Sequence, residues 1–111
     1  MPFIQVKHKT IEVDKNGYIK NLNEWDNDVA FALAEIEGIE LTPEHWEVIA
    51  VLRKFYREYD TSPTMRILVK QVGLQLGEEK GTSIFLMGLF PPSPVKIATK
   101  IAGLPRPTHC F

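Results

Sequence analysis

At residues 42–59 the chain reads TPEHWEVIAVLRKFYREY, and this stretch predicts a central helix around which the fold is organised. Thr42 can serve as the N-cap of a helix, and Pro43 is favoured at the first helical position because its missing N–H has no partner there in any case. His45 stands where a full capping box would have Glu or Gln, so the start signal is partial. The apolar side chains at helical spacing are Trp46, Val48, Ile49, Val51, Leu52, Phe55, Tyr56 and Tyr59. A stripe this broad predicts a central helix that is contacted from two sides.

Helix signals also flank this central stretch. Upstream, Asn27 or Asp26 can cap a helix that carries an apolar face and stops at Gly38. Downstream, three more helices are predicted from caps and prolines at their starts and from glycines or prolines at their ends. These three helices are expected within residues 62–77, 82–90 and 93–103.

The N-terminal residues alternate between apolar and polar side chains, which is typical of strands. Phe3–Val6 and Thr10–Val13 predict two short strands, and a turn follows at residues 14–17. We therefore predict a mainly α protein of the α+β class, with an N-terminal β-hairpin, about five packed helices and a flexible C-terminal arm. Residues 1–103 are expected to form a single helical domain, and residues 104–111 a mobile arm.

The composition indicates a single soluble domain. The chain has 111 residues, of which 44% are apolar, and this is enough for one modest core. Its formal net charge is −1, so we expect no strong overall field that attracts nucleic acid or an anionic membrane. One cysteine cannot form an internal disulfide, and the N-terminus lacks the basic region and apolar run of a secretory signal. We expect a cytoplasmic protein with no membrane partner.

The sequence carries no motif for a metal or cofactor site. The histidines His8, His45 and His109 have no partner at metal-ligand spacing, and no glycine-rich phosphate loop occurs. We therefore expect neither a metal nor a cofactor. Residues 42–59 and 63–76, joined by a short turn, resemble a helix-turn-helix. A nucleic-acid-binding regulator is thus a third alternative, against which the net negative charge argues.

The C-terminal tail, residues 103–111, reads GLPRPTHCF and carries the only cysteine, Cys110, next to last. Its two prolines cannot continue a helix, so the tail is predicted to leave the body as an extended arm, whose eight residues from Leu104 onward span at most roughly 25–30 Å. An exposed thiol on such an arm suits handing a group between partners that supply the activation themselves, with sulfane sulfur as the natural cargo. The adjacent terminal carboxylate opposes ionisation of the thiol, and Arg106 or His109 can offset this effect only in part.

Motifs along nearly the whole chain resemble one protein family. The tail motif is Lys100-Ile101-Ala102-Gly103-Leu104-Pro105-Arg106-Pro107, followed by the penultimate cysteine. The other motifs are Asp14-x-x-Gly17-Tyr18, Trp25, Glu37-Gly38-Ile39, Leu41-Thr42-Pro43-Glu44-His45-Trp46, Phe55-Tyr56, Ser62-Pro63 with Arg66, Gly77-Glu78-Glu79-Lys80-Gly81 and Leu89-Phe90-Pro91. With these motifs the chain resembles the DsrC/TusE family, which is the family of the dissimilatory sulfite reductase gamma-subunit.

The resemblance implies a mostly helical fold with an N-terminal β-hairpin and a mobile arm whose penultimate cysteine carries sulfur. Family members that partner sulfite reductase have a second arm cysteine, and that position aligns with Thr99 here. This departure favours the single-cysteine, TusE-like branch, a sulfurtransferase in which Cys110 is the nucleophile and persulfide site. Arg66, Arg106 and His109 are candidate supporting residues.

In that branch the cysteine is implied to accept persulfide sulfur from a TusBCD-type donor complex. It would pass the sulfur to a MnmA-type thiouridylase for 2-thiolation of the tRNA wobble uridine, so the protein would meet nucleic acid only through its partner. The alternative is a non-catalytic gamma-type subunit or sulfur carrier of a sulfite reductase or sulfur-oxidation complex.

Overall fold

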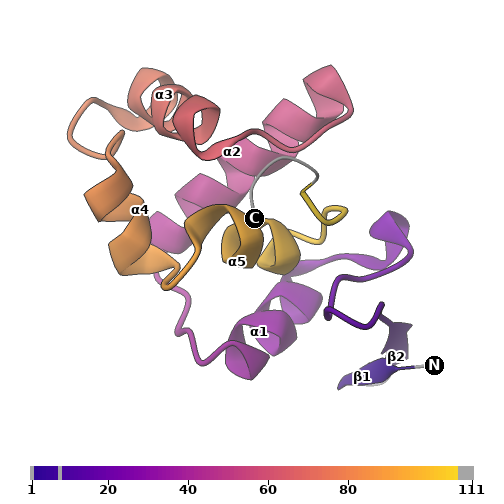
Figure 1. Ribbon diagram of the computed structural model, residues 1–111. Helices are drawn as coiled ribbons and strands as arrows, with labels where there is room; N and C mark the ends of the chain where they lie inside the picture. Colours follow the sequence, from indigo (N-terminus) through magenta and orange to yellow (C-terminus); the bar gives the residue numbers. More distant parts are fainter. Residues whose placement is uncertain (1, 8, 108–111) are drawn as a thin grey trace.

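A computed structural model describes residues 2–7 and 9–107 of the chain (Figure 1). Within these residues, a two-stranded hairpin precedes a short 3₁₀ helix and five α-helices, which confirms the predicted fold class. The elements are β1 (Phe3–Val6), β2 (Lys9–Glu12), η1 (Leu22–Glu24), α1 (Asn27–Ile36), α2 (Pro43–Tyr59), α3 (Met65–Leu76), α4 (Ser83–Leu89) and α5 (Pro94–Ile101).

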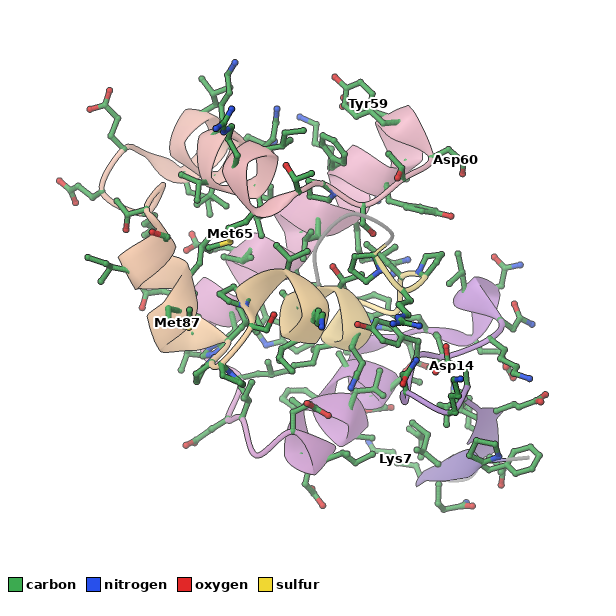
Figure 2. All side chains as sticks on the ribbon, viewed as in Figure 1. Lys7, Asp14, Tyr59, Asp60, Met65 and Met87 are labelled. Carbon is green, nitrogen blue, oxygen red and sulfur yellow. The ribbon has the colours of Figure 1, made fainter. Side chains whose placement is uncertain are left out.

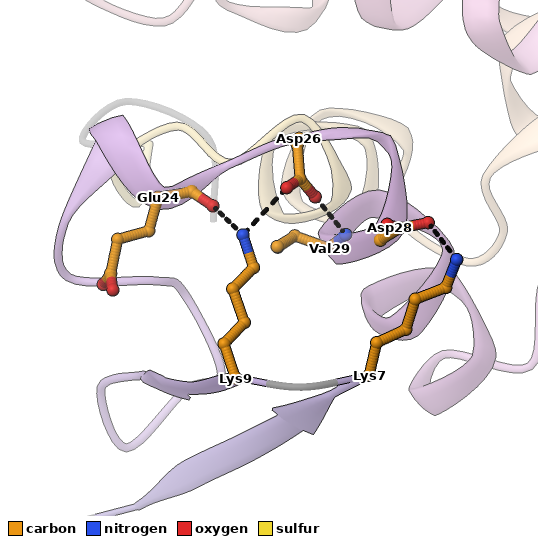
Figure 3. A network of polar contacts seen from close by, with 6 residues as sticks. All are labelled: Lys7, Lys9, Glu24, Asp26, Asp28 and Val29. Atoms are coloured by element: carbon orange, nitrogen blue, oxygen red, sulfur yellow. Dashed lines mark hydrogen bonds and ion pairs between the residues drawn. The ribbon is translucent and has the colours of Figure 1, made fainter.

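The two strands pair in an antiparallel hairpin in which Ile4 faces Ile11 across the ladder. Ile11 is fully buried, so one face of the hairpin closes against the helices while the other faces solvent. Two lysines fasten the hairpin to the start of α1 (Figure 3). Lys9 Nζ lies 2.8 Å from a carboxylate oxygen of Asp26, and Lys7 Nζ lies 3.1 Å from Asp28. Asp26 also caps α1.

The core of the molecule is centred on α5. This helix packs against α1, α2, α3 and α4, and Figure 1 shows it lying between α1 and α2. Ala98 and Ile101 on α5 are fully buried, as are Val48 and Leu52 on α2. Because α2 contacts both α3 and α5, the broad apolar stripe of residues 42–59 serves two neighbours, as its width predicts.

The N-terminus of α2 is capped by a histidine in place of the usual Glu or Gln. His45 Nδ1 accepts a hydrogen bond from the backbone N–H of Thr42 at 3.0 Å. Its other ring nitrogen lies 2.7 Å from the carbonyl oxygen of Leu89, at the end of α4. Because the amide N–H can only donate, Nδ1 is the acceptor, so Nε2 carries the proton and donates to Leu89. His45 therefore completes the N-terminal cap of α2, although the sequence signal for that cap was only partial. It also connects α2 to the end of α4.

One predicted helix start is wrong by two to three residues. Ser62-Pro63 was the expected start, but α3 begins at Met65, and its N-cap is Thr64. Thr64 Oγ1 accepts from the N–H of Ile67 at 3.3 Å, while Pro63 is buried in the turn before the helix. The side-chain acceptor at Thr64 fixes the first turn, and this local cap prevails over the proline preference at the first position.

Across the described residues, no helix combines the length and the apolar character that crossing a membrane would need.

Candidate functional site

The segment that leads to Cys110 begins at the C-terminus of α5, where backbone hydrogen bonds form a C-terminal helix cap. The N–H of Leu104 donates to the carbonyl of Thr99 at 3.1 Å, and the N–H of Gly103 donates to that of Lys100 at 3.0 Å. This pair of bonds is a Schellman motif, which needs a left-handed residue at its turn. Gly103 supplies it with a φ of +72°. The direction in which the chain leaves α5 is therefore fixed by hydrogen bonds.

Two side chains from distant segments bind the last carbonyls of this helix. Trp25 Nε1–H donates to the carbonyl oxygen of Ile101 at 2.8 Å, and Arg53 donates from Nη1 to that of Ala102. The guanidinium carbon of Arg53 also lies 4.0 Å from the centroid of the Trp25 ring, within cation–π range. A cation at a helix C-terminus faces the negative end of the helix dipole. We call residues 104–107, which follow this helix end, the arm root, and Trp25 and Arg53 the arm-root clamp.

The guanidinium of Arg53 in the arm-root clamp is partly buried. Burial lowers the pKa of Arg53, and the neighbouring charge of Arg57 lowers it further. Arg53 nevertheless stays protonated at neutral pH, because an arginine is not deprotonated in proteins under these conditions. At this partly buried position, the carbonyl oxygen of Ala102 and the aromatic face of Trp25 stabilise the positive charge of Arg53. The planar guanidinium can make both contacts at once.

The first half of the predicted arm packs on the body. Leu104 is only 3% exposed, and Pro107 is buried. A hollow of about 140 Å³ beside this segment is lined by Tyr56, Asp60, Thr61, Ser62, Pro105, Arg106 and Pro107. Figure 2 marks Asp60 where α2 ends. Leu104 thus buries its side chain against the body as the chain turns out of α5, and the mobile arm expected at residues 104–111 stays a prediction.

Arg106 also lines a second hollow, of about 320 Å³. We call it the α5 groove, and its lining residues are Asn16, Tyr18, Pro92, Ser93, Lys96, Ile97, Lys100 and Arg106. The Tyr18 hydroxyl donates to the carbonyl oxygen of Lys96 at 3.2 Å. Lys100 Nζ lies 3.3 Å from Glu37 and 5.3 Å from the centroid of the Tyr18 ring. The groove therefore brings three cationic side chains together next to the arm.

The charges around this groove act on Tyr18. Burial is the largest effect and raises the pKa of its hydroxyl. Arg106 lowers that pKa, while Asp14 and Glu37 raise it. Tyr18 is consequently neutral at physiological pH and serves as a hydrogen-bond donor to the helix backbone.

The structure describes only some of the predicted site residues. Cys110 and His109, like His8, lie outside the described residues, so their roles stay predictions. Arg106 is exposed and lines both hollows. Arg66 is exposed in the first turn of α3 and lines neither of these two hollows. Their supporting roles remain untested.

Thr99, the position where the family resemblance implies a second cysteine in some members, lies inside the body. It belongs to α5 and is fully buried. Its hydroxyl oxygen has no hydrogen-bond partner among the described residues. The position is therefore closed to solvent in this structure.

Sequence reasoning missed the arm-root clamp. Trp25 entered the prediction only as one of the family motifs, and Arg53 was not singled out. Arg53 follows the buried Leu52 and precedes the exposed Lys54, so helical periodicity alone gives it no special meaning. An arginine beside the apolar stripe was the available signal, and it is a weak one.

The fold and this site define a class of protein: a small helical body with an N-terminal hairpin that holds the base of a cysteine-bearing C-terminal segment. Comparison with known families agrees. The profile of the family described as "DsrC like protein" matches residues 5–111. The chain belongs to this DsrC-like family, which confirms the resemblance drawn from its motifs.

Curated relatives and solved structures match almost the whole chain. "Sulfurtransferase TusE" of Escherichia coli (strain K12) is 53% identical over 103 residues, covering 93% of this chain and 94% of the relative. "Sulfurtransferase TusE homolog" of Haemophilus influenzae is 52% identical over 101 residues, covering 91% and 93%. Allochromatium vinosum DsrC, solved by NMR, superposes with a TM-score of 0.89 at 48% identity, covering 98% and 97% of the two chains. The oxidized gamma-subunit of dissimilatory sulfite reductase (DsrC) from Archaeoglobus fulgidus gives 0.86 at 37%, covering 99% and 100%.

Proposed function

We propose that this protein is a sulfur-relay carrier that accepts sulfane sulfur as a persulfide on Cys110 and passes it to a tRNA 2-thiouridylase. The observation that carries the proposal is the 53% identity, over 93% of the chain, to relatives named "Sulfurtransferase TusE". The sequence adds a single, penultimate cysteine as the carrier group. Thr99 in place of a second cysteine fits the one-cysteine branch of the family.

The transfer chemistry needs only a thiolate and a persulfide. The Cys110 thiolate attacks the outer sulfur of a donor persulfide, so that a new S–S bond forms as the donor's S–S bond breaks. The electron pair leaves on the donor sulfur as a thiolate, and Cys110 becomes the persulfide. A thiolate on the acceptor then attacks the outer sulfur in the same way and restores the Cys110 thiolate. The sum is neither oxidation nor reduction, so no cofactor is required.

The packed arm root sets how far the thiol can travel. Cys110 follows Pro107 by three residues, which span at most about 10 Å when extended. While residues 104–107 stay packed, the thiol can enter a partner's site only if the body docks directly around the arm root. The clamp of Trp25 and Arg53 would keep that docking geometry constant from one partner to the next.

The proposed partners follow from the TusE-like branch. The donor would be a TusBCD-like complex and the acceptor a MnmA-like thiouridylase, both in the cytoplasm. A second candidate function, a gamma-type subunit or sulfur carrier of a sulfite reductase complex, is favoured by the likeness to the gamma-subunit from Archaeoglobus fulgidus. Thr99 argues against it, because a cycle that uses two arm cysteines cannot run on one thiol.

Intact-mass measurement tests the proposal. The purified protein is incubated with a cysteine desulfurase, its substrate cysteine and the donor complex, and then weighed under non-reducing conditions. Wild type should gain one sulfur atom, and Cys110→Ser should gain none. A relocated thiol, Cys110→Ser with Lys70→Cys on the exposed face of α3, is the matched control and should also gain none.

The acceptor step is tested separately, by nucleoside analysis of tRNA. Cells that lack the gene should lose 2-thiouridine at the wobble position, and wild type, but not Cys110→Ser, should restore it. Loading of the relocated thiol as fast as wild type would overturn the assignment of Cys110. Normal thiolation with the Cys110→Ser protein would overturn the relay to tRNA.

A further inference from the structure

Helix α4 presents exposed apolar side chains on one face. Ile84 is 85% exposed and Met87 is 43% exposed, and Figure 2 marks Met87 on the side of the molecule away from the hairpin. Together with Ser83 and Gly88, these two residues line a hollow of about 350 Å³. Residues 84, 87 and 88 stand at helical spacing, so they share one face of α4. We call Ser83, Ile84, Met87 and Gly88 the α4 patch.

Gly88 distinguishes this patch from an ordinary solvent-facing helix surface. A glycine inside a helix is less favourable than an alanine, because it has more conformational freedom to lose on folding. Gly88 is exposed, and outside its own helix no described atom lies within 4 Å of a Cβ placed on it. Packing within the described body therefore does not require a glycine here. A partner that lies against α4, by contrast, can approach the bare backbone closely at this point.

The surroundings of the α4 patch are acidic. Gly88 also lines a neighbouring hollow of about 240 Å³, which includes the exposed Glu40. Glu78 and Glu79 are exposed in the loop that leads into α4, and the lysine of that loop, Lys80, forms an ion pair with α2. Among the described residues, no lysine or arginine lines either hollow. An apolar centre with a negative rim is complementary to a surface that carries an apolar side chain between cations.

Adjoining hollows connect the α4 patch to the arm root. Gly88 is shared between the first two hollows, and Pro91 lines the second of them. Pro92, the next residue along the chain, lines the α5 groove together with Arg106 of the arm root. A partner that docks around the arm root can therefore extend its contact to α4 along this series of hollows.

We propose that the α4 patch is the docking surface for the enzyme that accepts the sulfur and binds tRNA. This inference rests on the proposed function and adds the place at which the acceptor is held. An enzyme that binds tRNA needs lysine and arginine side chains to meet the phosphates. The negative rim of the patch complements such a basic surface, and an aliphatic or aromatic side chain of the enzyme would fill the hollow beside Gly88.

Surface plasmon resonance with immobilised thiouridylase tests the proposal, using the full-length carrier at several salt concentrations. Gly88→Ala should resist urea better than wild type, because alanine is the better helix former. It should nevertheless bind the enzyme at least about fivefold more weakly, because its methyl group occupies the hollow. Ile84→Ala should weaken binding about tenfold. Glu40→Gln should mainly slow association and reduce its dependence on salt.

Gly73→Ala and Ile36→Ala are the matched controls. Gly73 lies inside α3, where an added Cβ would meet its nearest atom at an ordinary 3.6 Å, and Ile36 is 61% exposed on α1. Neither lines the α4 patch or the neighbouring hollow, so both variants should bind like wild type. The proposal is overturned if wild type does not bind the enzyme, or if Gly88→Ala and Ile84→Ala bind as well as wild type. It is also overturned if the two controls lose as much affinity as the patch variants.

Other occupants of the patch would give different results. If the donor complex docks there, Ile84→Ala should lose affinity for that complex and gain sulfur more slowly in the mass assay. If a second copy of the chain docks there, sedimentation should show a dimer of wild type that Ile84→Ala dissociates. Either result overturns the assignment of the patch to the acceptor.

The failure of this inference and that of the relay can be told apart. Cys110→Ser should bind the thiouridylase like wild type, since it leaves the α4 patch intact. Conversely, Ile84→Ala should still gain one sulfur atom at the wild-type rate. Unchanged enzyme binding by the patch variants, with normal sulfur loading of wild type, removes the docking assignment alone. Loss of loading in wild type, with binding that depends on the patch, removes the relay alone.

Discussion

Trp25 and Gly103 touch so closely that a Cβ atom placed on Gly103 would lie 2.1 Å from Cδ1 of the Trp25 ring. The two residues are far apart in the sequence, and the contact fixes the helix stop from which the arm departs. Gly103 therefore meets two demands at once, a left-handed backbone and a close approach to an indole ring.

Gly103→Ala should consequently destabilise the protein more than an ordinary glycine substitution. The left-handed backbone alone costs an alanine about 1–2 kcal/mol, and forced overlap in a packed site adds about 1–3 kcal/mol. Gly38→Ala is a matched control, because Gly38 has a φ of +73° but nothing within 4 Å of its added Cβ. Urea unfolding should show a larger loss for Gly103→Ala, and equal losses would mean that the indole contact carries no energy.

Arg53→Met should destabilise the arm root. It leaves the carbonyl of Ala102 without its charged donor and removes the cation from the Trp25 ring. A hydrogen bond to a charged group contributes about 1.5–3 kcal/mol, so a loss of about 2 kcal/mol in unfolding free energy is expected. Arg57→Met, at an exposed position in the last turn of α2, should change stability by less than about 0.5 kcal/mol. Similar losses in the two variants would contradict a specific role for Arg53.

The attachment of the hairpin should depend on pH through Asp26. A hydrogen bond from Lys9 is the largest cause that lowers the pKa of Asp26, and the backbone N–H of Val29 adds to it (Figure 3). The folded carboxyl therefore releases its proton more readily than the unfolded one, whose pKa is 3.8. The stabilisation is complete above that value and is lost as pH falls through the lowered folded pKa. Because the pair is exposed, its contribution should be below about 1 kcal/mol.

Unfolding of Asp26→Asn measured from neutral to acidic pH examines this prediction. Asparagine still caps a helix, so the difference from wild type isolates the charge. That difference should be present at pH 7 and shrink as Asp26 becomes protonated in wild type. Lys9→Met should remove most of the same pH effect, since it deletes the first cause of the shift. A difference that stays constant across the acid range would contradict the assignment.

Local signals in the sequence predicted the elements, whereas the contacts that build the arm root are long-range. Pro43 and Gly38 mark helix ends by their own backbone preferences, so they could be read directly. The bond from Trp25 to Ile101 joins residues 76 positions apart, and no pattern within one helix encodes it. The packing of Leu104 was missed for a related reason. Prolines near it indicate an extended chain but do not say whether that chain leaves the body.

Thr99→Val should leave the protein as stable as wild type or raise its stability by about 1 kcal/mol, because the buried hydroxyl has no hydrogen-bond partner among the described residues. Thr82→Val is the contrasting control. Thr82 Oγ1 accepts from the N–H of Phe85 at 3.0 Å as the N-cap of α4, so its removal should cost about 0.5–2 kcal/mol. Since Thr99 is closed to solvent, Thr99→Val should also load sulfur on Cys110 at the wild-type rate. A clear loss of loading in a variant that still folds would show that position 99 takes part in the transfer, and the single-cysteine chemistry would then be wrong.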